Sequence, residues 1–136
     1  HPYIATRGSF NSLQAINGTK ILYTKYFGEV HKLKSTYTYF FEIVYPKDRH
    51  VVDYGNTEDL FLIGAYDNIK QRDILLEEIT DTNIPKVKQI PCCNNWKELL
   101  KVDKKNEEGY VAYFNNGTRI KIKFPNYKKK YELVYG

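Results

Sequence analysis

Hydrophobic and polar residues form their clearest patterns in the middle of the chain. Residues 35–46, STYTYFFEIVYP, are rich in aromatic and β-branched residues and end at a proline, which predicts a strand. Residues 59–67, DLFLIGAYD, form a nearly continuous apolar run and predict a buried strand. Between these two segments, PKDR predicts a turn and HVVDY predicts a returning strand.

The first helix is predicted close to the start of the chain. Ser12 is a suitable N-cap, because its side chain can accept a hydrogen bond from a backbone N–H of the first turn. The helix that follows would hold Leu13, Ile16 and Tyr23 near one face. Gly18 lies inside this helix and weakens its intrinsic propensity.

Four further segments outside the last hairpin have predicted structure. Residues 71–81, QRDILLEEITD, have apolar residues at helical spacing, and 94–106, NNWKELLKVDKKN, combine an asparagine cap with such spacing. Residues 3–10, YIATRGSF, and 86–90, KVKQI, read as short strands. The sequence therefore predicts two more helices and two more strands.

The last predicted hairpin carries cations at every second position. Its strands, 109–114 and 119–124, flank an Asn-Asn-Gly turn. Side chains alternate between the two faces of a strand, so Arg119, Lys121 and Lys123 share one face and need water or an anion there.

The Asn-Gly dipeptide of this hairpin predicts a two-residue turn and hence a register. Ala112 would then face Lys121, Tyr110 would face Lys123, and Glu108 would follow on the same face. The opposite, buried face would hold Val111, Tyr113, Ile120 and Ile122. A slip of one residue would exchange these two faces.

Together the elements predict a mixed α+β fold, mainly antiparallel sheet with a few short helices. The chain has 136 residues, which favours a single domain over residues 1–136 that can bury a core without disulfides.

Composition narrows the function only slightly. The net charge of +5, from 21 Lys and Arg against 16 Asp and Glu, fits a polyanion partner, but proteins without such a partner also have it. No apolar run approaches the ~20 residues of a membrane span, which predicts no membrane partner. Cys92 and Cys93 are adjacent and read as reduced thiols, which fits a cytoplasmic location.

Three charged features are candidates for a binding site. Lys121 and Lys123 with Glu108 form either a phosphate and Mg²⁺ site or a solvated face of charge pairs. Glu42 interrupts an apolar strand, so it is either exposed at a sheet edge or held for a purpose. Arg7, which precedes a glycine, either approaches a ligand or lies on the surface.

Five segments, in this order, resemble motifs of the ATP-dependent RNA ligases, in particular the phage-type RNA ligase 1 family of covalent nucleotidyltransferases. The segments are ATRGSF, YFFEIVYPKDRHVVDYG, LFLIGAYD, EEGYV and KIKFPNY. The resemblance covers about Tyr3 to Leu133 and implies part of a nucleotidyltransferase (ATP-grasp-like ligase) domain. The second and fifth segments are the most specific.

The resemblance implies an activity and its cofactors. Such ligases join an RNA 5′-phosphate to a 3′-hydroxyl through lysyl-AMP and RNA-adenylate intermediates, with ATP and Mg²⁺. Lys121 and Lys123 would grip the α-phosphate, and Tyr127 would support catalysis beside them. Glu108 would help to bind the metal.

The resemblance also implies residues around the ribose and the base. Arg7 would contact the ribose or the phosphates, and Glu42 would bind the ribose hydroxyls. Leu62 or Ile63 would pack on the adenine, and the sequence does not choose between them.

One motif of the family does not occur in this sequence. The nucleophile motif Lys-x-Asp-Gly precedes the Arg-Gly segment in the family, and the chain contains no such string. The chain therefore resembles a domain truncated before its nucleophile. It is expected to be inactive in self-adenylation and to expose sheet edges through which it could self-associate.

Two other classes of function remain open from the sequence. A basic β-rich module could bind RNA or another polyanion without chemistry. A structural domain could carry the same charged faces with no ligand at all.

Overall fold

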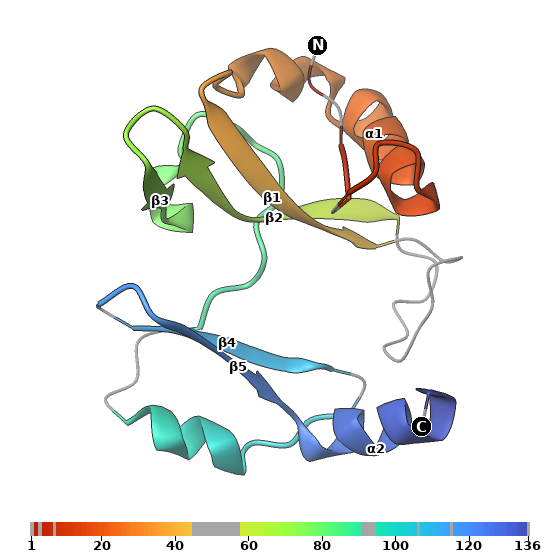
Figure 1. Cartoon of the computed structure of the whole chain (residues 1–136), viewed down its shortest axis with the longest axis vertical. Coiled ribbons are helices and arrows are strands. Elements are labelled where there is room, and N and C mark those ends of the chain that lie inside the picture. Colours follow the sequence, from red (N-terminus) through yellow and green to blue (C-terminus); the bar gives the residue numbers. More distant parts are fainter. Residues whose placement is uncertain are drawn as a thin grey trace. The chain divides into compact units, whose positions relative to one another are not determined.

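The computed structural model describes residues 2, 4–6, 8–44, 58–90, 95–105, 107–114 and 116–135 (Figure 1). These residues divide into two compact units, one from the described residues up to Val44 with 58–89, the other from Ile90 onward. The returning strand predicted at HVVDY, the two cysteines and Arg7 lie outside the described residues. That both units belong to one nucleotidyltransferase domain over 1–136 stays a prediction.

The first unit is built on a three-stranded antiparallel sheet in the order β1-β2-β3 (Figure 1). Its elements in chain order are α1 (Leu13–Lys25), the 3₁₀ helix η1 (Phe27–Lys32), β1 (Tyr37–Val44), β2 (Asp59–Asp67), β3 (Arg72–Ile74) and the 3₁₀ turn η2 (Leu76–Glu78). Strand β1 pairs with β2 along its whole length, with an irregularity between Phe40 and Phe41. Both central strand predictions are confirmed.

Helix α1 begins as predicted but buries a different face. The Ser12 side chain accepts a hydrogen bond from the Ala15 N–H at 3.1 Å and caps the helix. Leu13 and Ile16, predicted to share a face with Tyr23, are 62% and 55% exposed, so this apolar face is not the buried one.

Close packing at Gly18 explains which face of α1 is buried. The buried residues of the helix are Ala15, Gly18, Ile21 and Leu22. A Cβ at Gly18 would lie 2.8 Å from the Cδ1 of Ile43 on β1, so the glycine admits a close approach of helix and sheet. The face of α1 that carries Gly18 therefore turns inward, and Leu13 and Ile16 lie on another face.

Polar contacts join the end of α1 to the start of β2. Lys25 Nζ lies 3.3 Å from Asp59 Oδ2, and the Tyr26 hydroxyl donates a hydrogen bond to the same carboxylate. Burial, together with this hydrogen bond and the charge of Asp59, raises the pKa of Tyr26 above its ordinary value. Tyr26 is therefore the proton donor in this contact at any physiological pH.

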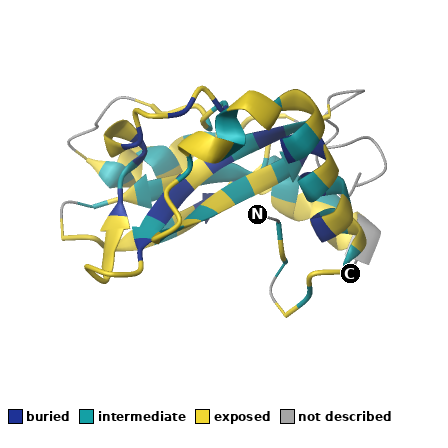
Figure 2. Ribbon diagram, turned by 90° about the horizontal axis from the view of Figure 1, so that it is seen from above, coloured by how far each residue is buried: buried dark blue, intermediate teal, exposed yellow. Residues whose placement is uncertain are grey.

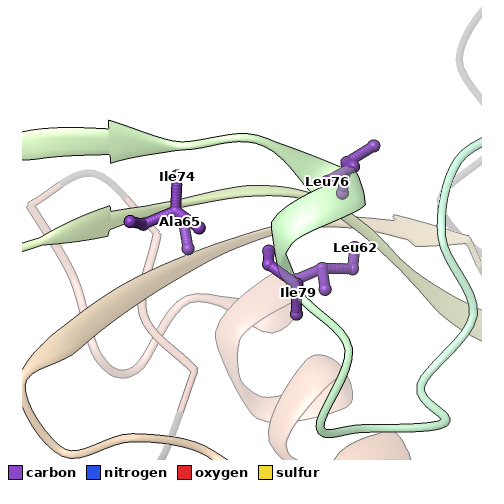
Figure 3. Close-up of a cluster of buried hydrophobic side chains, with 5 residues drawn as sticks. All are labelled: Leu62, Ala65, Ile74, Leu76 and Ile79. Atoms are coloured by element: carbon purple, nitrogen blue, oxygen red, sulfur yellow. The ribbon is translucent and has the colours of Figure 1, made fainter.

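The core of the first unit lies over β2. Five buried side chains, Leu62, Ala65, Ile74, Leu76 and Ile79, form one cluster (Figure 3). A second buried cluster, Ile21, Leu22, Leu60 and Ile84, joins α1 to the same strand. In Figure 2 more and less buried residues alternate along the strands, as a sheet with a shielded face requires.

The helix predicted over 71–81 is wrong. Residues Arg72–Ile74 instead pair with β2, where Ile74 lies opposite Ala65, and a short 3₁₀ turn follows. A tight turn after β2, with Gln71 at a φ of 55°, sends the chain back along the sheet. The apolar spacing of this segment suits a helix, but pairing with a buried strand outweighs it.

The strand predicted at 86–90 is reduced to a single bridge. Lys86 pairs in parallel with Leu62, because Leu62 N donates to Pro85 O and Val87 N donates to Leu62 O. The rest of this segment has no strand assignment.

The second unit contains the 3₁₀ helix η3 (Trp96–Lys101), the antiparallel strands β4 (Gly109–Tyr113) and β5 (Arg119–Lys123), and helix α2 (Pro125–Tyr135). Asn95 caps η3 as predicted, although the helix is of the 3₁₀ type and ends at Lys101. Both hairpin strands are confirmed. Helix α2 was not among the predicted elements.

The predicted fold class is confirmed at the level of a mixed α+β chain with two small antiparallel sheets and few helices. In the part of the chain that the structure describes, no helix is long and apolar enough to cross a membrane. Self-association through sheet edges stays a prediction.

The turn after β2 predicts a pH dependence of stability. The Asp67 carboxylate is 5% exposed and accepts hydrogen bonds from the N–H groups of Lys70 and Ile69, each at 3.0 Å. The hydrogen bond from the Lys70 N–H is the main effect that lowers the pKa of Asp67. The hydrogen bond from the Ile69 N–H lowers it further, and burial opposes both. A lowered folded-state pKa stabilises the fold above the unfolded pKa of about 4 and loses this effect as pH falls through the folded value.

We therefore expect Asp67→Asn to lower the urea midpoint at pH 7 and to flatten its decline below about pH 4. Glu77→Gln, an exposed carboxylate on η2, is the matched control and leaves the decline in place. Equal pH profiles for wild type and Asp67→Asn would contradict this account of the turn.

Candidate functional site

The hairpin register differs by one residue from the prediction. Strand β4 pairs Val111 with Lys121 and Gly109 with Lys123, so the predicted pairing of Ala112 with Lys121 is wrong. Phe114 N donates to Thr118 O, and Gly117 N donates back to Phe114 O at a φ of 88° for this glycine. This is the pattern of a longer loop with a left-handed glycine, which shifts β4 by one position.

The shift exchanges the faces of β4 but not those of β5. Val111 and Tyr113, predicted to be buried, are 63% and 45% exposed beside the cations of β5. Ile122 is 6% exposed and Ile120 half-buried, as predicted. Phe124, 1% exposed, forms a T-shaped contact with the Tyr110 ring at a centroid distance of 5.1 Å and extends this shielded face.

Glu108 and Lys121 form an ion pair, with 2.5 Å between Glu108 Oε1 and Lys121 Nζ. Both side chains reach solvent, at 35% and 58% exposure. The predicted meeting of this carboxylate with a hairpin lysine is therefore confirmed, although the register behind the prediction is wrong. Regular alternation in the observed register would place Glu108 on the face opposite Lys121.

Gly109 explains how Glu108 reaches the lysine. Its φ of 154° departs from the ordinary strand conformation directly after Glu108. A Cβ at this position would lie 1.8 Å from Ile122 O, so the two backbones approach here more closely than any other residue allows. The backbone turns at Gly109, and the carboxylate comes to the cationic face.

Lys123 lies beside two tyrosine rings of α2. Its Nζ is 5.7 Å from the Tyr127 ring centroid and 5.9 Å from that of Tyr131. The two rings are themselves 6.0 Å apart and inclined at 35°. The structure thus brings Lys123 and Tyr127 together, as the resemblance implied, and adds Tyr131.

The sequence contains a signal for Tyr131 that none of the predicted elements includes. Tyr127 and Tyr131 are four residues apart, the spacing that places side chains on one face of a helix. Pro125, at the first position of α2, suits a helix start. The Asn126 N–H, which has no partner within the helix, donates to Asp103 Oδ1 at 3.0 Å.

A third lysine borders this region. Lys104 Nζ is 5.6 Å from the centroid of the Tyr110 ring and 3.9 Å from Glu107 Oε2. Interaction with the Tyr110 hydroxyl, and then the charge of Glu107, raises the pKa of Lys104. This lysine stays cationic at neutral pH and adds to the positive potential of the second unit.

The donor set at Glu108 limits how it could hold a metal. Among the described residues, no three His, Cys, Asp or Glu side chains gather around one point. Mg²⁺ needs six oxygens and often takes only one or two from carboxylates. Glu108 therefore fits Mg²⁺ only if phosphate and water supply the other ligands, which is how a Mg-nucleotide binds.

The remaining candidates lie in the first unit. Glu42 is exposed on β1, an outer strand of the sheet, opposite Phe61. Leu62 is 0% exposed in the core, whereas Ile63 is 47% exposed, so of these two only Ile63 offers surface to a base. Glu42 and the lysines belong to different units, and their meeting around one nucleotide stays a prediction.

Comparisons with protein families and with curated proteins found no relative of this chain. No model of a protein family matches the chain, and no curated protein matches it. The case for a function therefore depends on the chain's own residues.

Gly109 provides a direct test of the site's geometry. We expect Gly109→Ala to destabilise the second unit by at least about 2 kcal/mol, because its Cβ would overlap Ile122 O and its φ disfavours alanine. Gly117→Ala, with a φ of 88° but open space around its Cβ, should cost only about 1–2 kcal/mol. Denaturation followed by Trp96 fluorescence measures both. A smaller effect at Gly109 than at Gly117 would contradict the close approach.

Proposed function

We propose that this chain is part of an ATP-dependent RNA ligase and that its β4–β5 hairpin binds the phosphates of ATP. The observation that carries the proposal is the hairpin itself, where Glu108 contacts Lys121 and Lys123 lies beside Tyr127. These are the residues to which the ligase-like segments EEGYV and KIKFPNY assign nucleotide and metal contacts. Sequence order and spatial grouping thus support the same site.

The two lysines are suited to phosphate contact. Each ammonium group is exposed and held in place without burial, one by a carboxylate and one by aromatic rings. A phosphoryl oxygen could approach both as a charge-assisted acceptor. Since ligation moves negative charge on phosphate oxygens at each step, fixed cations at this position would stabilise the transition states.

Glu108 would have two partners in turn. Without nucleotide it pairs with Lys121. When Mg-ATP is bound, its oxygens would face the metal, which supplies charge neutralisation between the phosphates. Lys121 would then be released toward the α-phosphate.

The resemblance assigns contacts with the ribose and the adenine to Arg7, Glu42 and either Leu62 or Ile63. Tyr127 would position Lys123. The sequence contains no Lys-x-Asp-Gly nucleophile motif. We therefore expect these residues to bind ATP without forming a lysyl-AMP adduct.

A second candidate function is a non-catalytic module that binds RNA or another polyanion. It is favoured by the charge of residues 95–135, which hold ten Lys and Arg but five Asp and Glu. Such a module would need no ATP, and nucleotide binding separates the two candidates.

The test is a titration of the chain with Mg-ATP, followed by amide chemical shifts. We expect saturable shifts at Glu108, Lys121 and Lys123. The double variant Lys121→Ala/Lys123→Ala should weaken Mg-ATP binding at least about tenfold, because two charge-assisted contacts are lost. Its free energy of unfolding should change by less than about 1 kcal/mol, since both lysines are exposed.

The matched control is Lys97→Ala/Lys101→Ala, which removes two exposed lysines from η3 of the same unit. It should bind Mg-ATP as the wild type does. The ligase proposal fails if Mg-ATP produces no saturable shifts, or if both double variants weaken binding equally.

A further inference from the structure

The positive charge of this chain is concentrated in one unit. Residues 95–135 carry ten Lys and Arg against five Asp and Glu, a difference of +5. Residues 8–44 and 58–89 together carry eight against nine, a difference of −1. The excess of the whole chain thus lies with the hairpin and α2, and a charge concentrated in this way is typical of a surface for nucleic acid.

Within that unit, α2 combines cations with aromatic rings on one side. Tyr127 and Tyr131 share a face of the helix, and Lys123 lies beside both rings. At 3.6 residues per turn, Lys128 and Lys130 flank this face on its two sides. We name these five residues, Lys123, Tyr127, Lys128, Lys130 and Tyr131, the α2 platform.

The platform is open rather than part of a core. Tyr131 is 46% exposed, Lys123 and Lys128 are exposed, and Tyr127 and Lys130 are half-buried. In the described part of the chain, no carboxylate forms an ion pair with Lys128 or Lys130. Lys101 of η3, Lys104 and Lys121, by contrast, each pair with a carboxylate.

We propose that the α2 platform binds a single-stranded segment of RNA, with a base stacked on Tyr131 and backbone phosphates at Lys128 and Lys130. Aromatic rings stack on bases of any sequence, and lysines between them follow the backbone, which is how single strands are held without sequence readout. That the strand is RNA rests on the proposed ligase function. The placement beside Lys123 would deliver the strand to the hairpin that holds the nucleotide phosphates.

The experiment measures fluorescence anisotropy of a 5′-phosphorylated oligouridylate of about twelve nucleotides, a length within the range of such sites. We expect Tyr131→Ala to weaken its binding by roughly 5- to 100-fold, and Tyr131→Phe to restore it, because the ring rather than the hydroxyl stacks. Lys128→Gln/Lys130→Gln should reduce the salt dependence of binding, with the slope of log K against log salt shallower by about 1.4.

The control variant Lys97→Gln/Lys101→Gln removes the same charge from η3 and should leave affinity within about twofold of wild type. The platform is overturned if Tyr131→Ala binds the oligouridylate as the wild type does, or if the η3 variant loses as much affinity and slope as the α2 variant. Far-ultraviolet circular dichroism confirms that each variant is folded.

Mg-ATP binding, measured on the same variants, distinguishes a failure of the platform from a failure of the ligase proposal. Lys128→Gln/Lys130→Gln, which keeps both rings beside Lys123, should leave the Mg-ATP shifts at Glu108 and Lys121 in place. Shifts with Mg-ATP but RNA binding insensitive to Tyr131 would overturn the platform alone. RNA binding that depends on Tyr131, without any Mg-ATP shifts, would support the platform and overturn the ligase.

Discussion

The close approach of two backbones at Gly109 is the constraint on which the candidate site depends. A side chain there would overlap Ile122 O, so only glycine lets β4 meet β5 at this point. Glu108 immediately precedes the contact, and its carbonyl accepts the Phe124 N–H at 2.8 Å. The same few residues therefore close the hairpin, turn the carboxylate toward Lys121 and lead the chain into α2.

Two neighbouring lysines of β5 are held by different physical means. Lys121 is oriented by a carboxylate, an interaction that salt screens and that a metal ion can replace. Lys123 is oriented by two aromatic rings, whose attraction for a cation does not require an opposite charge. Neither lysine is buried, so both keep their hydration and remain accessible to an anion. Lys121 can therefore exchange its carboxylate for another partner, whereas Lys123 keeps its aromatic neighbours.

Strands with strong local signals could be predicted from the sequence. The apolar run of β2 and the aromatic run of β1 have the same bounds, or nearly so, in the structure, because burial and propensity agree there. The helix predicted at 71–81 failed, since pairing of Ile74 with Ala65 outweighs helical spacing. The buried face of α1 was missed because Gly18 reads as a weak helix former, while its lack of a side chain decides the packing against Ile43.

By itself the sequence determined the charged residues of the hairpin, their alternation along β5 and the order of the ligase-like segments, because period and composition are local properties. Only the tertiary structure decided that β4 slips by one residue, that Glu108 nevertheless reaches Lys121, and that Tyr131 joins Lys123. Register depends on loop geometry and on contacts between distant backbones. A pattern of residues along one strand does not contain these contacts.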